Sequence, residues 1–338
     1  MKYKDIYNFL FGIYNIGNTC YINSIIQILV HSELFIKNFV IKYKLINENR
    51  NNITYLFYKT IFDISKNKHL KVIDISDFIY NFKKVHPIFG GAIQFDAAEF
   101  MRVLLEDINN DLNEIAMIKN HVIIENDIDK SKLILSQEYK KNFFEKECSI
   151  ISNNFYSQLI SIYSCQCKHE LYAFQYIMDF PLLIPDNKFN LNIRDLLEFY
   201  FSPENIEFET KCSKCNRKCI HSKYSKISYP PNILILSLQR FNKNTNSKIN
   251  CFIKYSENLN ISDFIDKECG YEGDTSYYLY GVINHKGSLS SGHYYSYVKF
   301  SKESYNKWYE FNDDRVVELG TNLNDNPYAY ILFYKKID

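Results

Sequence analysis

Two patterns in the sequence predict an α+β protein, with a helical lobe followed by an antiparallel sheet lobe. Apolar residues recur at helical spacing in the first third of the chain. From about Phe155 they gather in short runs rich in Tyr, Ile and Phe, and turn residues separate these runs. Helices segregated from strands in this way characterise α+β folds, and the cleft between two such lobes is a natural binding site.

A helix is predicted directly after Cys20. Between residues 22 and 29 apolar side chains fall at positions i, i+3, i+4 and i+7, and Gly17 to Thr19 supply the turn that leads into the helix. A second apolar stripe predicts a helix from Ala97 to Leu112. Cys20 is therefore expected at or near the N-terminus of a helix.

Strands are predicted in the second lobe, where β-branched and aromatic residues form short runs. The runs are Asn232 to Phe241, Tyr277 to Ile283, His293 to Phe300 and Tyr330 to Tyr334. We expect them to form an antiparallel sheet.

The composition predicts a folded protein without a global electric field. With 46% apolar residues the chain can bury a sizeable core, and 40 basic against 39 acidic residues give a net charge of +1. We therefore expect no nucleic-acid and no membrane partner. Nine cysteines, an odd number in a chain this long, favour a reducing compartment, so we expect a cytoplasmic and/or nuclear protein that is not secreted.

Cys20 is a candidate nucleophile. Most lone cysteines are buried structural residues, but the exposed N–H groups and the dipole of a helix N-terminus favour the thiolate, which is the reactive form. A cysteine hydrolase brings its histidine from elsewhere in the fold. Among eight histidines, His293 follows Gly292 at the entrance of a predicted strand, where the backbone can be approached closely. The alternative is a surface histidine at a strand end.

Four other cysteines form two close pairs, which are Cys165 with Cys167 and Cys212 with Cys215. Two such pairs separated by a few tens of residues predict a structural tetrahedral zinc site that joins two segments of the sheet. The first pair has one intervening residue, so His169 could replace Cys167, and Cys219 could be a bystander or a substitute. Simple packing of the thiols remains the alternative.

Asp96 is a candidate N-cap. It precedes the helix predicted from Ala97, and Glu99 follows three residues later, as in a capping box. Local physics therefore favours a capping role for these two residues.

Five segments together resemble the catalytic domain of the ubiquitin-specific proteases, in that family's order and over Gly12 to Tyr334. The segment Gly12 to Ser24, with Gln27 after it, resembles the cysteine box, and His285 to Tyr297 resembles the histidine box. The others are Gln94 to Phe100, Leu234 to Phe241 and Trp308 to Asp314.

The resemblance implies a papain-like cysteine peptidase fold shaped as a hand, in a single domain over residues 12–336. The thumb would occupy about 12–145 and the fingers and palm about 146–336. It implies a deubiquitinating thiol protease that hydrolyses the bond after the C-terminal glycine of ubiquitin through a thioester. Its partners would be ubiquitin, ubiquitinated proteins and possible regulatory subunits.

The resemblance also implies roles for individual residues. Cys20 would be the nucleophile, His293 the general base, Asn312 the group that orients His293, and Asn15 the oxyanion donor, with Asp313 assisting. Four residues would bind the substrate's tail: Gln94, Asp96, Glu99 and Tyr294. The family's fingers carry zinc on cysteine pairs in these places, usually with two residues between the first two cysteines.

Strand geometry supports Asn312 independently. Paired positions in an antiparallel hairpin have a constant sum, and 293 + 312 = 605 centres the hairpin between Lys302 and Glu303. The amide oxygen of Asn312 could then accept the imidazole N–H, while Asp313 would point to the opposite face. The alternative is that Asp313 or Asp314 orients His293 through a strand irregularity.

Two other functions compete with this hypothesis. One is a catalytically silent ubiquitin-binding module, which the presence of all the expected site residues disfavours. The other is an unrelated thiol acyltransferase, which leaves the boxes at 94–100 and 234–241 unexplained.

Overall fold

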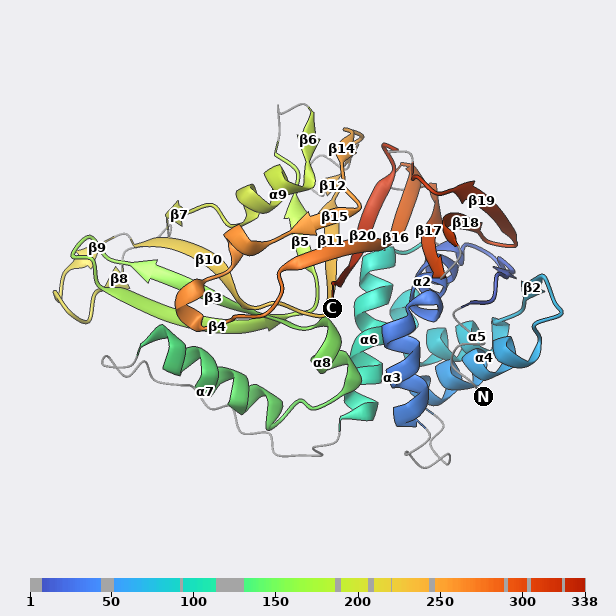
Figure 1. Cartoon of the computed structure of the whole chain (residues 1–338), viewed down its shortest axis with the longest axis horizontal. Helices are drawn as coiled ribbons and strands as arrows, with labels where there is room; N and C mark the ends of the chain where they lie inside the picture. Colours follow the sequence, from blue (N-terminus) through green and yellow to red (C-terminus); the bar gives the residue numbers. More distant parts are fainter. Residues whose placement is uncertain are drawn as a thin grey trace.

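A computed structural model describes most of the chain and confirms the predicted order of helices before sheet. The described residues are 8–43, 52–91, 94–113, 131–185, 190–205, 210–219, 221–242, 247–288, 291–302, 305–323 and 326–337. Figure 1 shows α2 to α6 gathered at one end, beside strands β16 to β20, while β3, β4 and β10 extend to the other end. The fold is α+β.

The helical part is built from α2 (Cys20–His31), α3 (Glu33–Tyr43), α4 (Ile53–Lys66), α5 (Ser76–Val85) and α6 (Ala97–Leu112). Both predicted helices are confirmed, and α6 has the predicted bounds. Asp96 accepts hydrogen bonds from the backbone N–H groups of Ala98 at 2.7 Å and Glu99 at 3.2 Å, which confirms it as the N-cap. A two-stranded parallel pair, β1 (Gly12–Ile13) and β2 (Val72–Ile73), lies beside these helices.

An eight-stranded sheet forms the centre, in the order β19-β18-β17-β16-β20-β11-β5, with β15 paired to β16. Its strands are β5 (Phe180–Leu183), β11 (Ile233–Gln239), β15 (Asn258–Asn260), β16 (Ser276–Gly287), β17 (Gly292–Lys302), β18 (Tyr305–Asn312), β19 (Arg315–Gly320) and β20 (Ala329–Lys336). Three of the four predicted runs lie within β16, β17 and β20, and the fourth, Asn232 to Phe241, extends beyond both ends of β11. Apart from β5 against β11, the pairs in this sheet are antiparallel.

Strand β11 of the central sheet is buried on both faces. Along β11, Ile233 and Ile235 belong to the core shared with the helices, while Leu234 and Leu236 belong to a second core on the other face. Strands covered on both sides read as continuous apolar runs, as the segment from 233 to 238 does.

A second sheet, in the order β4-β3-β10-β7, extends away from the helices. It contains β3 (Ser157–Ser164), β4 (Glu170–Ile177), β7 (Glu204–Asn205) and β10 (Ser222–Tyr229). Helix α7 (Lys132–Phe144) runs along β4, and α8 (Ile150–Phe155) leads into β3. Short strand pairs complete the described part: β6 (Leu191–Asn192) with β14 (Ile253–Lys254), β8 (Thr210–Lys211) with β9 (Lys218–Cys219), and β12 (Phe241–Asn242) with β13 (Ser247–Lys248).

One helix falls inside the segment predicted to be sheet. Helix α9 (Ile193–Tyr200) begins with a reciprocal capping box between Asn192 and Asp195, and it buries Leu196 and Leu197. The capping box was a readable signal in the sequence, and it outweighs the aromatic residues that suggested a strand.

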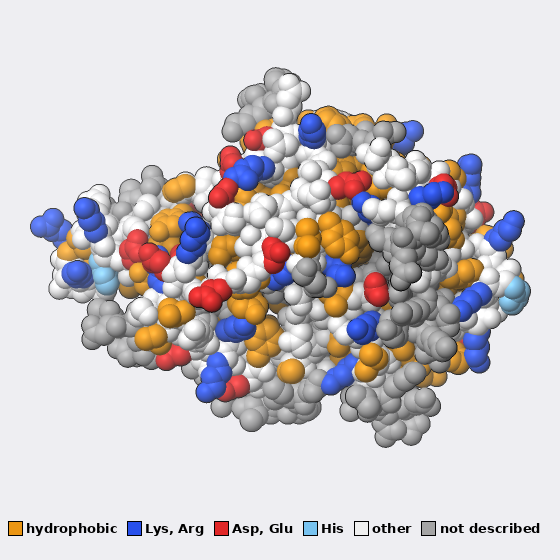
Figure 2. All heavy atoms as spheres, in the orientation of Figure 1, with side chains coloured by type: hydrophobic (Ala, Val, Ile, Leu, Met, Phe, Trp, Pro, Cys, Tyr) orange, Lys and Arg blue, Asp and Glu red, His pale blue; other side chains and the backbone are white. Residues whose placement is uncertain are grey.

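Charges of both signs are mixed on the surface. Figure 2 shows acidic and basic side chains interspersed over the visible face, with apolar side chains between them. Within the described residues, no single helix is long and apolar enough to cross a membrane; α2 and α3 pass that test only as a pair, bent by 83° at their junction.

Candidate active site

Cys20 is the first residue of α2 and is only 3% exposed. The turn before it places Gly17 at φ +113° and Asn18 at φ 50°, in the left-handed region that Gly and Asn tolerate best. Two N–H groups donate to its Sγ. These are Nε2 of Gln94 at 3.0 Å and the backbone N of Tyr294 at 3.5 Å. The sulfur therefore lies at the N-terminus of a buried helix with two further donors aimed at it.

His293 is the second residue of β17 and contacts both Cys20 and Asn312. Its Nε2–H donates to Oδ1 of Asn312 at 2.7 Å, since an amide oxygen can only accept. This leaves Nδ1 for Cys20. The hydrogen bond with Cys20 raises the pKa of His293 to about 9, against the opposing effect of burial, and Asn312 adds to the rise. The ring is therefore an imidazolium at neutral pH, in hydrogen-bond contact with the sulfur.

The hairpin that joins His293 to Asn312 differs from its predicted register. Ser296 pairs with Phe311 and Lys302 with Tyr305, so paired positions sum to 607 and not to 605. The prediction that 293 lies directly opposite 312 was therefore wrong by two residues. Because a shift of two keeps every side chain on its face, the two residues are diagonal neighbours and still meet. The two residues at the tip, 303–304, lie outside the described part.

Asp313 does not point away from His293 as expected. It follows the end of β18 and has φ 52°, which breaks the alternation of the strand. Its Oδ2 lies 3.8 Å from Nε2 of His293. Its carboxylate accepts hydrogen bonds from Nδ2 of Asn15 and from Nδ2 of Asn23, both at 2.8 Å. Asn312 is the closer partner of the ring, and Asp313 anchors the loop before Cys20.

Asn15 lies in that loop, and hydrogen bonds at both ends of its side-chain amide fix the orientation of the amide. Its Oδ1 accepts from the backbone N–H of Gly17 at 3.0 Å and of Thr19 at 3.2 Å, while its Nδ2 donates to Asp313. The donor end of the amide therefore faces the carboxylate oxygen of Asp313 that also lies 3.8 Å from Nε2 of His293.

A cavity of about 510 Å³ opens between α6 and the sheet beside Cys20. The four residues predicted to bind substrate all line it: Gln94, Asp96, Glu99 and Tyr294. These four side chains differ in how far they are free to contact a substrate. Glu99 is exposed, Tyr294 is buried, and both oxygens of Asp96 are engaged, Oδ1 by the helix cap and Oδ2 by the hydroxyl of Tyr330.

The lining residues that were not singled out from the sequence include two buried basic side chains. Arg240 is fully buried, and its guanidinium donates to the backbone oxygens of Ala329, Ile249 and Cys251. His285 is 2% exposed, and burial lowers its pKa to about 3, so its ring is neutral. Both lie inside segments that resemble family boxes, Arg240 in 234–241 and His285 in 285–297. No pattern in a single sequence distinguishes these two residues from their neighbours.

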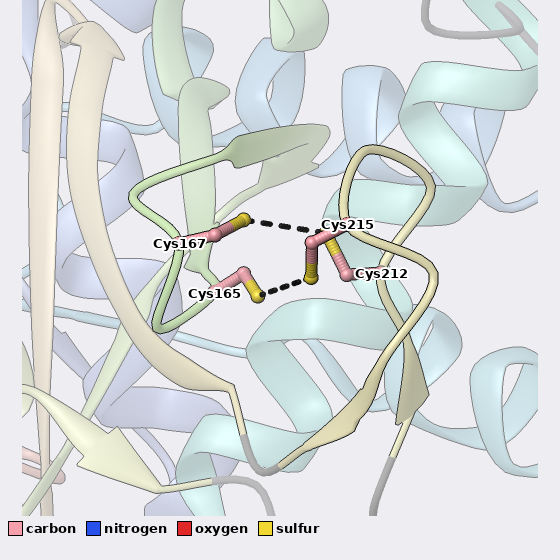
Figure 3. A group of neighbouring side chains, drawn as sticks. All are labelled: Cys165, Cys167, Cys212 and Cys215. Atoms are coloured by element: carbon pink, nitrogen blue, oxygen red, sulfur yellow. Dashed lines mark hydrogen bonds between the residues drawn. The ribbon is translucent and has the colours of Figure 1, made fainter.

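The four paired cysteines meet in space, as predicted. Figure 3 shows Cys165 and Cys167 facing Cys212 and Cys215, with Sγ to Sγ distances of 3.8 Å from Cys165 to Cys215 and 3.7 Å from Cys167 to Cys212. All four sulfurs lie within 4.8 Å of one another. Zn–S bonds of about 2.3 Å in a tetrahedron would separate the sulfurs by about 3.8 Å. The cluster can therefore hold a metal ion.

The alternative ligands can be judged in part. His169 turns its Nε2 to the hydroxyl of Ser213 at 3.1 Å, while Cys167 joins the cluster, so the histidine does not replace the cysteine. The side chain of Cys219 lies outside what the structure describes. The backbone N–H of Cys215 lowers the pKa of Cys212 to about 6, which favours the thiolate that a metal requires.

We expect the pKa of His293 to fall when Cys20 is replaced. In Cys20→Ala the hydrogen bond that raises this pKa most is lost, while burial, which lowers it, remains. An NMR titration of the His293 ring should show a midpoint near pH 9 in the parent protein and at least one unit lower in the variant. Cys148→Ala, at a cysteine outside the cleft, serves as control. Equal midpoints in all three proteins would mean that Cys20 does not interact with His293.

Comparison with known proteins agrees with this geometry. The family model described as ubiquitin carboxyl-terminal hydrolase matches residues 11–334. Ubiquitin carboxyl-terminal hydrolase 5 of Saccharomyces cerevisiae is 28% identical over 96% of this chain and 44% of its own length. Ubiquitin carboxyl-terminal hydrolase 2 of Gallus gallus is 28% identical over 96% of this chain and 93% of its own. The chain thus spans less than half of the yeast relative but nearly all of the chicken one.

Solved structures show the same fold. The SAGA DUB module Ubp8/Sgf11/Sus1/Sgf73 bound to monoubiquitin aligns with a TM-score of 0.77 and 23% identity, over all of this chain and 71% of the matched chain. The same module bound to ubiquitin aldehyde aligns with a TM-score of 0.76 and 24% identity, over 97% and 70%. The predicted papain-like fold and the family resemblance are both confirmed. Since the family model covers nearly the whole chain, the chain belongs to the ubiquitin carboxyl-terminal hydrolase family.

Proposed function

We propose that this chain is a deubiquitinating thiol protease that cleaves the isopeptide or peptide bond after the C-terminal glycine of ubiquitin. The observation that carries the proposal is the line of Cys20, His293 and Asn312, in which the imidazole contacts the sulfur and donates to the amide oxygen at 2.7 Å. This is the arrangement that an activated thiol nucleophile requires.

The chemistry follows from the protonation states. The Cys20 thiolate attacks the carbonyl carbon of the glycine, and the imidazolium of His293 gives its proton to the departing amine. A thioester remains on Cys20. His293, now neutral, takes a proton from water, whose oxygen attacks the thioester, and the ubiquitin carboxylate leaves while the thiolate returns. Asn312 keeps Nε2 protonated throughout, so that Nδ1 exchanges the proton.

We assign the oxyanion to the amide of Asn15. A neutral amide can stabilise the developing negative charge without altering the charge balance that keeps Cys20 ionised, and one such donor is worth about 3 kcal/mol of barrier. Its Nδ2 carries two protons, and Asp313 uses one of them.

The cavity beside Cys20 is our candidate channel for the extended ubiquitin tail, which carries cationic residues before Gly-Gly. Exposed Glu99 offers a carboxylate to those residues. Asp96 contributes by fixing the start of α6, and buried Tyr294 by forming the wall. We assign about 12–145 to the thumb and 146–336 to the fingers and palm of the hand.

Regulatory subunits are proposed partners because a solved relative of this fold is described in a module with Sgf11, Sus1 and Sgf73. We further propose a cytoplasmic or nuclear location. None of the eight cysteines whose side chains the structure describes forms a disulfide, which suits a reducing compartment.

We propose that the four-cysteine cluster binds one structural zinc. Bound zinc would supply a crosslink between the turn after β3 and the loop after β8, and the sulfur distances fit a tetrahedral site.

Reaction with a ubiquitin probe that carries a C-terminal electrophile tests the proposed function. We expect a single adduct, located at Cys20 by mass spectrometry, and no adduct in Cys20→Ser. A folded protein that forms no adduct would support the silent ubiquitin-binding module instead. An adduct on any other cysteine would remove Cys20 from the mechanism.

Asn312→Ala should lower kcat/KM on a fluorogenic ubiquitin amide about 10- to 100-fold, because a hydrogen bond to a charged ring is worth roughly 1.5–3 kcal/mol. Asp313→Ala should cost less, since its oxygen lies 3.8 Å from the ring against 2.7 Å for Asn312. Full activity of Asn312→Ala together with an inactive Asp313→Ala would transfer the orienting role to the aspartate.

Elemental analysis should find one zinc per chain. The double variant Cys212→Ser and Cys215→Ser should contain none, whereas Cys148→Ser, at a cysteine outside the cluster, should keep it. A chelator should lower the thermal stability of the parent protein alone. If the parent protein contains no zinc after growth with ample zinc, the zinc proposal fails and the four thiols only pack against one another.

A further inference from the structure

Gln94 touches the sulfur that reacts, which the predicted role in binding the substrate tail does not explain. Its side chain is half-buried, and both of its polar ends are engaged within the protein. Nε2 lies 3.0 Å from Sγ of Cys20, and Oε1 lies 3.2 Å from the backbone N of Gly292. Each end of the amide therefore has a partner within the protein, and one of these partners is the sulfur itself.

The direction of the amide is fixed by chemistry. The N–H of Gly292 can only donate, so the atom of Gln94 that faces it must be the oxygen. The nitrogen must then face Cys20. A flipped amide would set two donors against each other at Gly292 and turn an acceptor oxygen toward the sulfur.

Both anchors of Gln94 are rigid. On one side it lies two residues before Asp96, whose carboxylate caps α6 and also accepts from Tyr330. On the other side Gly292 begins β17, and a Cβ at this position would come within 2.1 Å of Nε2 of His285. No other residue fits there without displacing His285. The Gln94 side chain thus spans from the helical lobe to the sheet lobe across the nucleophile.

Three donors converge on Sγ from different parts of the chain. They are Nε2 of Gln94, the backbone N–H of Tyr294 and the ring of His293. A thiolate accepts such hydrogen bonds better than a neutral thiol, because bonds to a charged acceptor are roughly twice as strong. Each donor therefore favours ionisation of Cys20.

We propose that Gln94 is a catalytic residue that holds Cys20 in its ionised form and directs the sulfur toward His293. This inference deepens the proposed function, since it concerns the same nucleophile. It places a side-chain donor from the helical lobe on the sulfur, in addition to the helix N-terminus and the histidine.

Alkylation of Cys20 by iodoacetamide tests the proposal without ubiquitin. The thiolate displaces iodide and forms a thioether, so the rate follows the ionised fraction. We would measure it from pH 5 to pH 10, following Cys20 by mass spectrometry. The variants are Gln94→Leu, which removes the donor, and Gln94→Glu, which keeps the shape but replaces the donor by a carboxylate. Gln175→Leu, on an exposed site of β4, is the matched control.

In Gln94→Leu the midpoint of the rate profile should rise by about one pH unit, which is about a tenfold slower reaction at pH values below the midpoint. In Gln94→Glu it should rise further, because a negative charge faces the thiolate. Gln175→Leu should match the parent. If Gln94→Leu proves unfolded, Gln94→Glu decides.

Unchanged midpoints in both variants would overturn the proposal, even if the plateau rate changed, because a purely structural role alters access and not ionisation. The two proposals can fail separately. If the Gln94 variants shift the midpoint but the parent protein does not react with the ubiquitin probe, the role of Gln94 stands and the proposed function is rejected.

Discussion

The burial of α2 against β17 is the constraint on which the site depends. Every residue of α2 is buried, from Cys20 to His31, and the helix packs on the strand that carries His293 and Tyr294. Close-packed interiors do not deform gradually, so the sulfur cannot move relative to the imidazole without repacking the core. Gln27 strengthens this by donating to the backbone oxygen of Phe11 at 2.8 Å, which ties the helix to the chain that precedes it. The proposed nucleophile is thus part of the core, and the core holds the donors around its sulfur in place.

A network of amides around Asp313 extends that rigidity to the loop before Cys20. Asn23, one turn along α2, donates to Oδ1 of Asp313 and also contacts the backbone oxygen of Tyr14 at 3.3 Å. Asn15 donates to Oδ2. With both oxygens engaged by neutral amides, the carboxylate is stabilised without a proton from His293, and the ring is left to Asn312. The charge of Asp313 still favours the imidazolium through space, so the two neighbouring residues act on His293 by different means.

Sequence patterns predicted what local rules determine and missed what depends on three-dimensional approach. The bounds of α6 were predictable because Asp96 caps it, and the cysteine cluster because spacing alone pairs its members. The hairpin register was not, since residues 302–305 lack the Asn-Gly or Asp-Gly signal that fixes a turn. The predicted contact between His293 and Asn312 is still present, because a register shift of two residues leaves every side chain on the same face of the sheet. The prediction that Asp313 points to the opposite face from His293 was wrong, because strand alternation does not reveal the left-handed backbone at this residue. The bond from Gln94 to Cys20 joins positions 74 residues apart, and no periodicity encodes such a meeting.

The outer sheet, β4-β3-β10-β7, has a much smaller apolar core than the part of the molecule around Cys20. Its small core cluster has only three fully buried members, Ile160, Ile162 and Cys269, and β4 is at best half-buried along its length. A sheet with so little apolar burial needs another constraint on its distal end, where β8 and β9 lie (Figure 1). The four cysteines follow β3 and β8, and their sulfurs lie close together. The active site belongs to a different and much larger core, which includes Cys20 and Tyr294. Loss of the proposed zinc would therefore loosen the outer sheet first, while the distance between sulfur and imidazole stays fixed by α2 and β17.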